Sequence, residues 1–88
     1  MKYHITPRQA KEVTEEVFYS FFNEIVHRKD WANYHHKKMD IGKMIDYLDE
    51  VIISRSVIDG MWSVVAFNKH YEGKELVDTL WEAMKDEI

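Results

Sequence analysis

The sequence predicts an α+β fold, with a long N-terminal helix, a second helix, a β-hairpin over residues 51–67 and a C-terminal helix. Apolar residues recur every three or four positions in three separate stretches, as on helices that bury one face. Between the last two stretches, seven of the fifteen residues 51–65 are Val or Ile, which favours strands. The 88 residues contain one proline, three glycines and no linker-like segment, so a single domain over residues 1–88 is expected.

The N-terminal helix has the clearest start signal. Thr6 is followed by Pro7 at the first helical position and by Gln9 three residues later, which is a capping box. An apolar stripe then runs from Ala10 to Val26, so we expect one continuous helix that ends near residues 27–29. Its apolar face is wide, and self-association or a partner would cover the surplus.

Two further helices follow from the same spacing. Asp40 is a candidate N-cap for a helix whose apolar positions run from Ile41 to Ile52. Residues 74–87 follow Gly73 and form the C-terminal helix, with early acidic residues that the helix dipole favours. Its apolar side consists of Leu76, Val77, Leu80, Trp81 and Met84.

Residues 51–67 have two interpretations. Asp59-Gly60 favours a type I′ turn between strands 51–58 and 61–67, because both central residues of that turn need a positive φ. Alternatively, Ser56 caps a helix that contains Gly60, at a cost of about 1 kcal/mol, and the fold is an all-α bundle. The Val and Ile content favours the hairpin.

Composition removes several classes of function. Without cysteine, the chain has no disulfide framework, thiolate zinc site or cysteine nucleophile. It contains no P-loop, GxGxxG, GxSxG or HExxH motif. It has no apolar run that would span a bilayer and no signal-peptide core, so no membrane contact and a cytoplasmic location are expected. We therefore expect no enzyme and no cofactor.

A metal site is also not expected. His27, His35, His36 and Asp40 are donors that zinc or nickel accepts. However, adjacent histidine side chains diverge in most backbone conformations, and the neighbouring cations oppose a dication. We expect instead that these histidines lie in solvent and titrate near neutral pH.

Charge is unevenly distributed. The net charge is −4, but residues 1–39 carry seven Lys and Arg against five Asp and Glu, and residues 40–88 carry five against eleven. Cations and aromatic rings alternate in residues 27–38, which is typical of single-stranded nucleic-acid contacts, although Trp31 and Tyr34 would equally anchor a short turn. The candidate residues of this basic loop, for nucleic acid or an acidic partner, are Arg28, Lys29, Trp31, Tyr34, His35, His36, Lys37 and Lys38.

The acidic half has two interpretations as well. Its carboxylates keep a domain soluble, or they imitate the phosphates of nucleic acid and occupy a basic groove on another protein. The candidate contacts of this acidic face are Asp46, Asp49, Glu50, Glu72, Glu75, Asp78 and Glu82.

Two segments carry a resemblance to known proteins. Residues 40–48 have the sequence DIGKMIDYL, and residues 71–85 have the sequence YEGKELVDTLWEAMK. They resemble the "IGxMIxxL" helix and the C-terminal "ELxDALWEAVK" helix of short proteins from phages and prophages of low-GC Gram-positive bacteria. The resemblance implies an origin in a mobile element. It also implies an inhibitor or adaptor of host machinery, a class that includes anti-defence proteins.

The expected function is therefore a non-enzymatic phage or prophage accessory protein. It would bind and inhibit a bacterial host protein in the host cytoplasm, by acidic mimicry of nucleic acid in one version, and would form a homo-oligomer. The alternative is a nucleic-acid-binding or transcriptional regulatory module that uses the basic loop 27–38.

Overall fold

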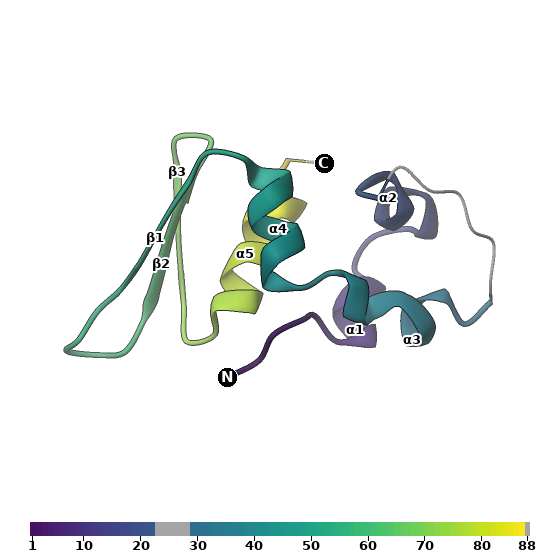
Figure 1. Cartoon of the computed structure of the whole chain (residues 1–88), viewed down its shortest axis with the longest axis horizontal. Coiled ribbons are helices and arrows are strands. Elements are labelled where there is room, and N and C mark those ends of the chain that lie inside the picture. The colour runs from purple at the N-terminus through teal and green to yellow at the C-terminus, as the bar shows by residue number, and fades with distance from the viewer. Residues whose placement is uncertain (23–28, 88) are drawn as a thin grey trace.

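The α+β class is confirmed. The computed structural model describes residues 1–22 and 29–87, which form helices and a three-stranded antiparallel sheet (Figure 1). The all-α alternative is wrong. The elements in chain order are α1 (Pro7–Ala10), α2 (Glu15–Ser20), α3 (Trp31–His35), a 3₁₀ turn η1 (His36–Lys38), α4 (Ile41–Leu48), β1 (Val51–Arg55), β2 (Trp62–Ala66), β3 (Lys69–Gly73) and α5 (Leu76–Lys85).

Helix α5 lies at the centre of an elongated molecule of 43 × 24 × 18 Å. One side of α5 packs on β2 and β3, and α4 also packs against it. The short helices α1 to α3 gather at the end away from the sheet (Figure 1). Because α5 contacts both the sheet and α4, its apolar residues Trp81, Leu80 and Met84 are completely buried. No helix within the described ranges is long and apolar enough to span a bilayer.

The prediction of one long N-terminal helix is wrong. Thr6 and Gln9 form the predicted capping box, but α1 ends at Ala10. A second helix begins after Thr14, whose hydroxyl accepts a hydrogen bond from the Val17 N–H at 3.2 Å. A threonine in that position offers the backbone a cap, and capping competes with continuation of the helix. Residues 23–28, which include most of the predicted end of the helix near residues 27–29, lie outside the described residues.

The two later helices are confirmed in outline. The Asp40 carboxylate accepts a hydrogen bond from the Lys43 N–H at 2.8 Å, as an N-cap does. Helix α4 ends at Leu48, and the last two predicted helical positions, Val51 and Ile52, belong to β1.

The predicted hairpin over residues 51–67 is confirmed, but its connection is not the type I′ turn expected at Asp59-Gly60. Strands β1 and β2 are joined by a six-residue loop, Ser56–Met61, in which Gly60 has φ 70° and the Asp59 carboxylate accepts from the Met61 N–H. The two-residue turn with positive φ at both positions is Phe67-Asn68, at 52° and 62°. It joins β2 to β3, a third strand that the hairpin prediction lacked.

Candidate functional site

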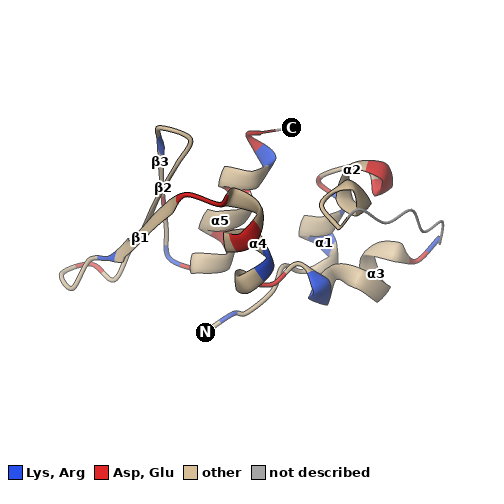
Figure 2. Cartoon of the chain, turned by 45° about the horizontal axis from the view of Figure 1, so that its top comes forward, with Lys and Arg blue, Asp and Glu red and all other residues tan. Residues whose placement is uncertain are grey.

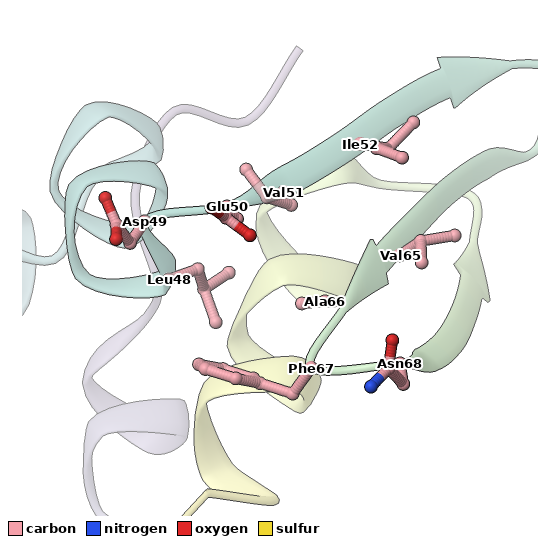
Figure 3. Close-up of a pocket in the computed structure, with 9 residues that line it drawn as sticks. All are labelled: Leu48, Asp49, Glu50, Val51, Ile52, Val65, Ala66, Phe67 and Asn68. Carbon is pink, nitrogen blue, oxygen red and sulfur yellow. The ribbon is translucent and has the colours of Figure 1, made fainter.

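A surface groove of about 630 Å³ lies where the end of α4 meets the end of the sheet (Figure 3). We call it the α4–sheet groove. Most of its lining is apolar, and the polar members lie in the link after α4 and in the β2–β3 turn. The lining residues are Leu48, Asp49, Glu50, Val51, Ile52, Val65, Ala66, Phe67 and Asn68. A surface of this type suits a partner segment with apolar side chains that is flanked by polar or charged residues.

Backbone strain is concentrated in this groove. The described residues include three non-glycine residues with positive φ, namely Asp49 at 63°, Phe67 at 52° and Asn68 at 62°. All three line the groove. Asparagine and aspartate tolerate this region, but an aromatic residue such as Phe67 is held there at a cost of roughly 1–3 kcal/mol. Strain of this kind clusters at binding sites, where the side chain must point in a set direction.

The strain presents Phe67 at the surface. Its side chain is 47% exposed, and in Figure 3 its ring projects toward Leu48 across the groove. On the neighbouring strands, Ile52 lies opposite Val65, and these side chains are 69% and 36% exposed. The groove therefore combines a strained aromatic side chain with an uncovered pair of β-branched side chains.

The acidic rim of the groove is formed by Asp49 and Glu50, and Asp46 precedes them on the last turn of α4. We call these three residues the acidic corner. All are exposed, and within the described part of the chain their side chains make no hydrogen bond or ion pair. Figure 2 shows red along the end of α4 and the link to β1. Their negative charges remain available to a cationic partner.

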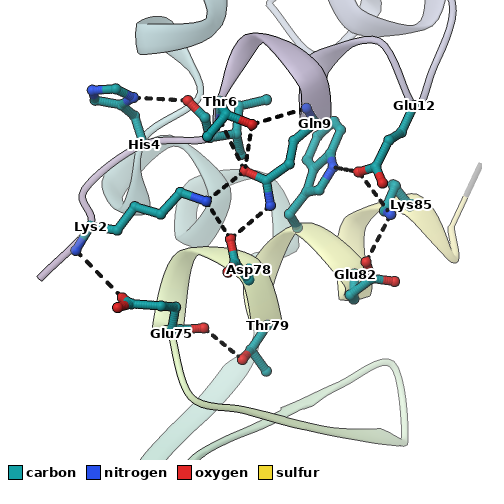
Figure 4. Close-up of polar contacts among 12 residues, drawn as sticks. Lys2, His4, Thr6, Gln9, Glu12, Glu75, Asp78, Thr79, Glu82 and Lys85 are labelled. Carbon is teal, nitrogen blue, oxygen red and sulfur yellow. Dashed lines mark hydrogen bonds and ion pairs between the residues drawn. The ribbon is translucent and has the colours of Figure 1, made fainter.

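The other four acidic candidates do not form one face with this corner. The Glu72 carboxylate lies 3.5 Å from His70 on β3. The Glu75, Asp78 and Glu82 carboxylates contact the N-terminal segment or Lys85, as Figure 4 shows. Glu75 and Asp78 thus connect the start of α5 to the N-terminal segment, Glu82 pairs with Lys85 within α5, and the structure separates all three from the acidic corner.

Asp78 carries most of this internal network. Its Oδ1 accepts hydrogen bonds from Lys2 Nζ at 2.6 Å and from Gln9 Nε2 at 2.7 Å (Figure 4). Burial raises the pKa of this carboxyl, but the two hydrogen bonds and the charge of Lys2 outweigh it, so the pKa lies below its usual value. Asp78 therefore holds α5 to the N-terminal segment.

A second polar contact lies further along α5. The Trp81 indole N–H donates to Glu12 Oε1 at 2.9 Å, and Lys85 Nζ lies 3.1 Å from the same oxygen. Burial lowers the pKa of Lys85, but its bonds to Glu82 and Glu12 prevail and raise it. Glu12 reaches α5 from the break between α1 and α2, so the break that the sequence did not predict positions this contact.

The basic segment was predicted as a loop, but residues 31–38 form α3 and η1, and residues 29–30 form a turn before them. His27 and Arg28 lie outside the described residues. Trp31 packs on Phe18 at a ring distance of 5.2 Å and joins the core, while Tyr34 is 60% exposed. Lys29, Lys37 and Lys38 are exposed. Only one of the two predicted stacking rings therefore remains on the surface.

The histidines of this segment also contact neighbouring groups. The His36 ring lies within hydrogen-bonding distance of the Ala32 carbonyl, at 3.0 Å, and 5.3 Å from the His4 ring. His35 lies 5.5 Å from the Tyr19 ring. In the described ranges, no three His, Asp or Glu side chains come close enough together to hold a metal ion.

Most residues of the α4–sheet groove are not among the predicted site residues. The predicted strand 61–67 ends at Phe67, although the asparagine that follows it is a turn signal. Strand β3 has the sequence KHYEG, which is too polar to suggest a strand. Comparison of the chain with models of protein families, with curated proteins and with solved structures finds no match in any of the three.

Proposed function

We propose that this chain is a non-enzymatic binding protein of phage or prophage origin that inhibits a bacterial host protein through the α4–sheet groove and the acidic corner. The observation that supports it best is the positive φ of Asp49, Phe67 and Asn68, since all three of these positions line one apolar groove and Phe67 is strained there. The resemblance of residues 40–48 and 71–85 to phage and prophage helices supports the origin.

The chemistry of the groove specifies the kind of partner. Its exposed apolar residues suit a partner segment that contributes aliphatic or aromatic side chains. The carboxylates of Asp46, Asp49 and Glu50 favour Lys or Arg beside that segment. A nucleic-acid-handling protein whose basic groove accepts these carboxylates in place of phosphates has this chemistry, and it is the anti-defence version of the proposal.

The test is affinity capture from a Gram-positive host lysate treated with nuclease. One variant combines Asp46→Asn with Glu50→Gln, and its matched control combines Glu16→Gln with Glu87→Gln. Each pair removes two exposed carboxylates that make no hydrogen bond or ion pair in the described part of the chain. We expect a partner at near one-to-one stoichiometry that the control retains and the acidic-corner variant loses. Equal retention by both variants would contradict the proposal.

Phe67→Asn tests the groove itself. Asparagine accepts a positive φ more readily than phenylalanine, so we expect the free energy of unfolding to rise by about 1 kcal/mol or stay unchanged. We expect partner binding to weaken at least about tenfold, because the exposed ring is lost. A variant that binds as the original chain does would exclude the groove from the interface.

Nucleic-acid binding through the basic segment is the second candidate function. Tyr34 is 60% exposed, and the exposed Lys37 and Lys38 follow it in η1, so one stacking ring and two cations share this surface. If this function holds, Lys37→Ala and Lys38→Ala each reduce the salt dependence of nucleic-acid binding by about one unit of slope. Undetectable or salt-independent binding would rule it out.

A further inference from the structure

Strand β1 is an open edge of the sheet. The strand order is β1-β2-β3, and among the described helices and strands β1 packs extensively only against β2. Helix α5 covers β2 and β3. At its loop end the β1–β2 hairpin projects away from the helices (Figures 1 and 2). The outer edge of β1 is therefore accessible to another strand.

The backbone groups that this edge presents follow from the ladder. The Ser56 N–H donates to the Met61 carbonyl at 2.9 Å, which places these two residues at a hydrogen-bonding position of the ladder. In an antiparallel ladder such pairs alternate with non-bonded ones, so Ser54 and Ile52 bond to β2. The N–H and C=O groups of Val51, Ile53 and Arg55 then point outward from the free edge.

Apart from the charged residue Arg55 at its end, the edge strand has neither the proline nor the lysine that normally prevents pairing with another chain. The opposite edge strand, β3, carries the exposed charged or titratable residues Lys69, His70 and Glu72. Strand β1 has the sequence VIISR, with three β-branched apolar residues, no proline and no lysine. At the tip of its hairpin, Val57 and Ile58 are 99% and 95% exposed.

We propose that β1 pairs antiparallel with β1 of a second copy, about a two-fold axis through Ile53, and joins two sheets into one. This register uses every outward-facing group of the strand, because Ile53 pairs with its own symmetry mate and Val51 pairs with Arg55. It also makes Arg55 of one copy a diagonal neighbour of Asp49 of the other, which brings opposite charges together.

The same register accounts for the exposed tip. The tip residues Val57 and Ile58 follow β1, the groove residues Leu48 and Asp49 precede it, and both pairs are equally distant from Ile53 in sequence. Pairing about Ile53 therefore brings the tip of each copy to the groove end of the other. The second copy adds two apolar side chains to the wall of each α4–sheet groove, and the dimer presents two such grooves.

Disulfide trapping tests the register, because the chain has no cysteine of its own. In this pairing the two Ile53 positions are about 5.5 Å apart between Cα atoms, within the disulfide range. The two Ile52 positions are diagonal neighbours, about 7–8 Å apart and outside that range. Under mild oxidation, Ile53→Cys should cross-link faster than Ile52→Cys, although Ile52 is the more exposed residue. Equal or faster cross-linking of Ile52→Cys would overturn the proposal.

Sedimentation equilibrium over a concentration series tests the interface. Arg55→Pro removes an outward N–H that β2 does not use, and Glu72→Pro removes the equivalent group on β3 as the matched control. We expect Arg55→Pro and the double variant Val57→Ser with Ile58→Ser to raise the dimer Kd at least about tenfold. Glu72→Pro should leave the Kd unchanged. A wild-type chain that is monomeric throughout, or a dimer lost only in Glu72→Pro, would overturn the proposal.

Discussion

The contact between Glu12 and Trp81 allows a quantitative test of how α5 is held. Glu12→Ala removes the acceptor of the buried indole N–H, 2.9 Å away, and the partner of Lys85. A hydrogen bond to a charged group contributes about 1.5–3 kcal/mol, but Glu12 is 45% exposed, so water replaces part of it and about 1–2 kcal/mol remains. The exposed ion pair with Lys85 adds about 0–1 kcal/mol. The total of about 2 kcal/mol lowers the Tm by roughly 8–16 °C in a domain of this size.

A double-mutant cycle in urea unfolding separates the two contributions. We expect a coupling energy of about 1–2 kcal/mol between Glu12→Ala and Trp81→Phe, and below about 1 kcal/mol between Glu12→Ala and Lys85→Met. Glu16→Ala is the control and should change stability by less than about 0.5 kcal/mol. A coupling near zero with Trp81→Phe, or an equal loss in Glu16→Ala, would refute the assignment of this hydrogen bond.

Three further predictions concern pH and packing. The pKa of Asp78 is below its usual 3.8, so its contribution to stability is complete above pH 4 and is lost as the pH falls through the lowered pKa. When the free energy of unfolding is measured at decreasing pH, the wild type should show this loss and Asp78→Asn should not. Burial, and then the hydrogen bond to Asp86, raise the pKa of Tyr71 from 10.0 to about 12, so its contribution to stability is complete below pH 10 and is lost toward pH 12. In an ultraviolet titration, the phenolate absorbance that appears near pH 12 should be smaller in Tyr71→Phe than in the wild type. A Cβ at Gly73 would collide with Thr79 Oγ1, so Gly73→Ala should lower the free energy of unfolding in urea by about 1–3 kcal/mol, and adding Thr79→Ala should restore part of it. Gly42→Ala in α4 is the control and should leave the free energy of unfolding unchanged or raise it.

The sequence correctly predicted two helix starts and the buried face of α5, which depend on residues close together in the chain. The capping residues Thr6 and Asp40 start helices where the sequence placed them, and the apolar side of residues 76–84 is the buried side of α5. These features depend on neighbours within one turn of the chain, so the spacing of residues is sufficient to identify them.

Features that depend on distant contacts were not predictable from spacing. A continuous helix through Lys11–Thr14 would agree with the apolar stripe, but the break allows Glu12 to reach Trp81, which is 69 residues away. The polar strand β3 exists because it pairs with β2 and packs on α5. Its neighbour turn, Phe67-Asn68, has an unfavourable residue at its first position, so turn preferences pointed to Asp59-Gly60 instead.

The candidate site also has a part that was predictable from the sequence and a part that depends on distant contacts. Asp46, Asp49 and Glu50 were among the predicted contacts because exposed charge is visible in a sequence. Which of the seven carboxylates make internal contacts and which form the acidic corner depends on which of them Lys2, Gln9, His70 and Lys85 reach. The apolar part of the groove depends on how the three strands pair. The predicted hairpin, with its turn at Asp59-Gly60 and no third strand, does not give this pairing.

The central position of α5 determines when the chain can fold during synthesis. Helix α5 is synthesised after the elements that pack against it. These are the inner side of the sheet, α4 and the residues Lys2, Gln9 and Glu12. Until residues 76–85 leave the exit tunnel, Val64 and Ala66 have no helix to cover them and the edge of β1 is already synthesised. Nascent chains on one messenger RNA are close together at that stage, so the strand that we propose to join two finished copies is also the one most exposed to premature pairing.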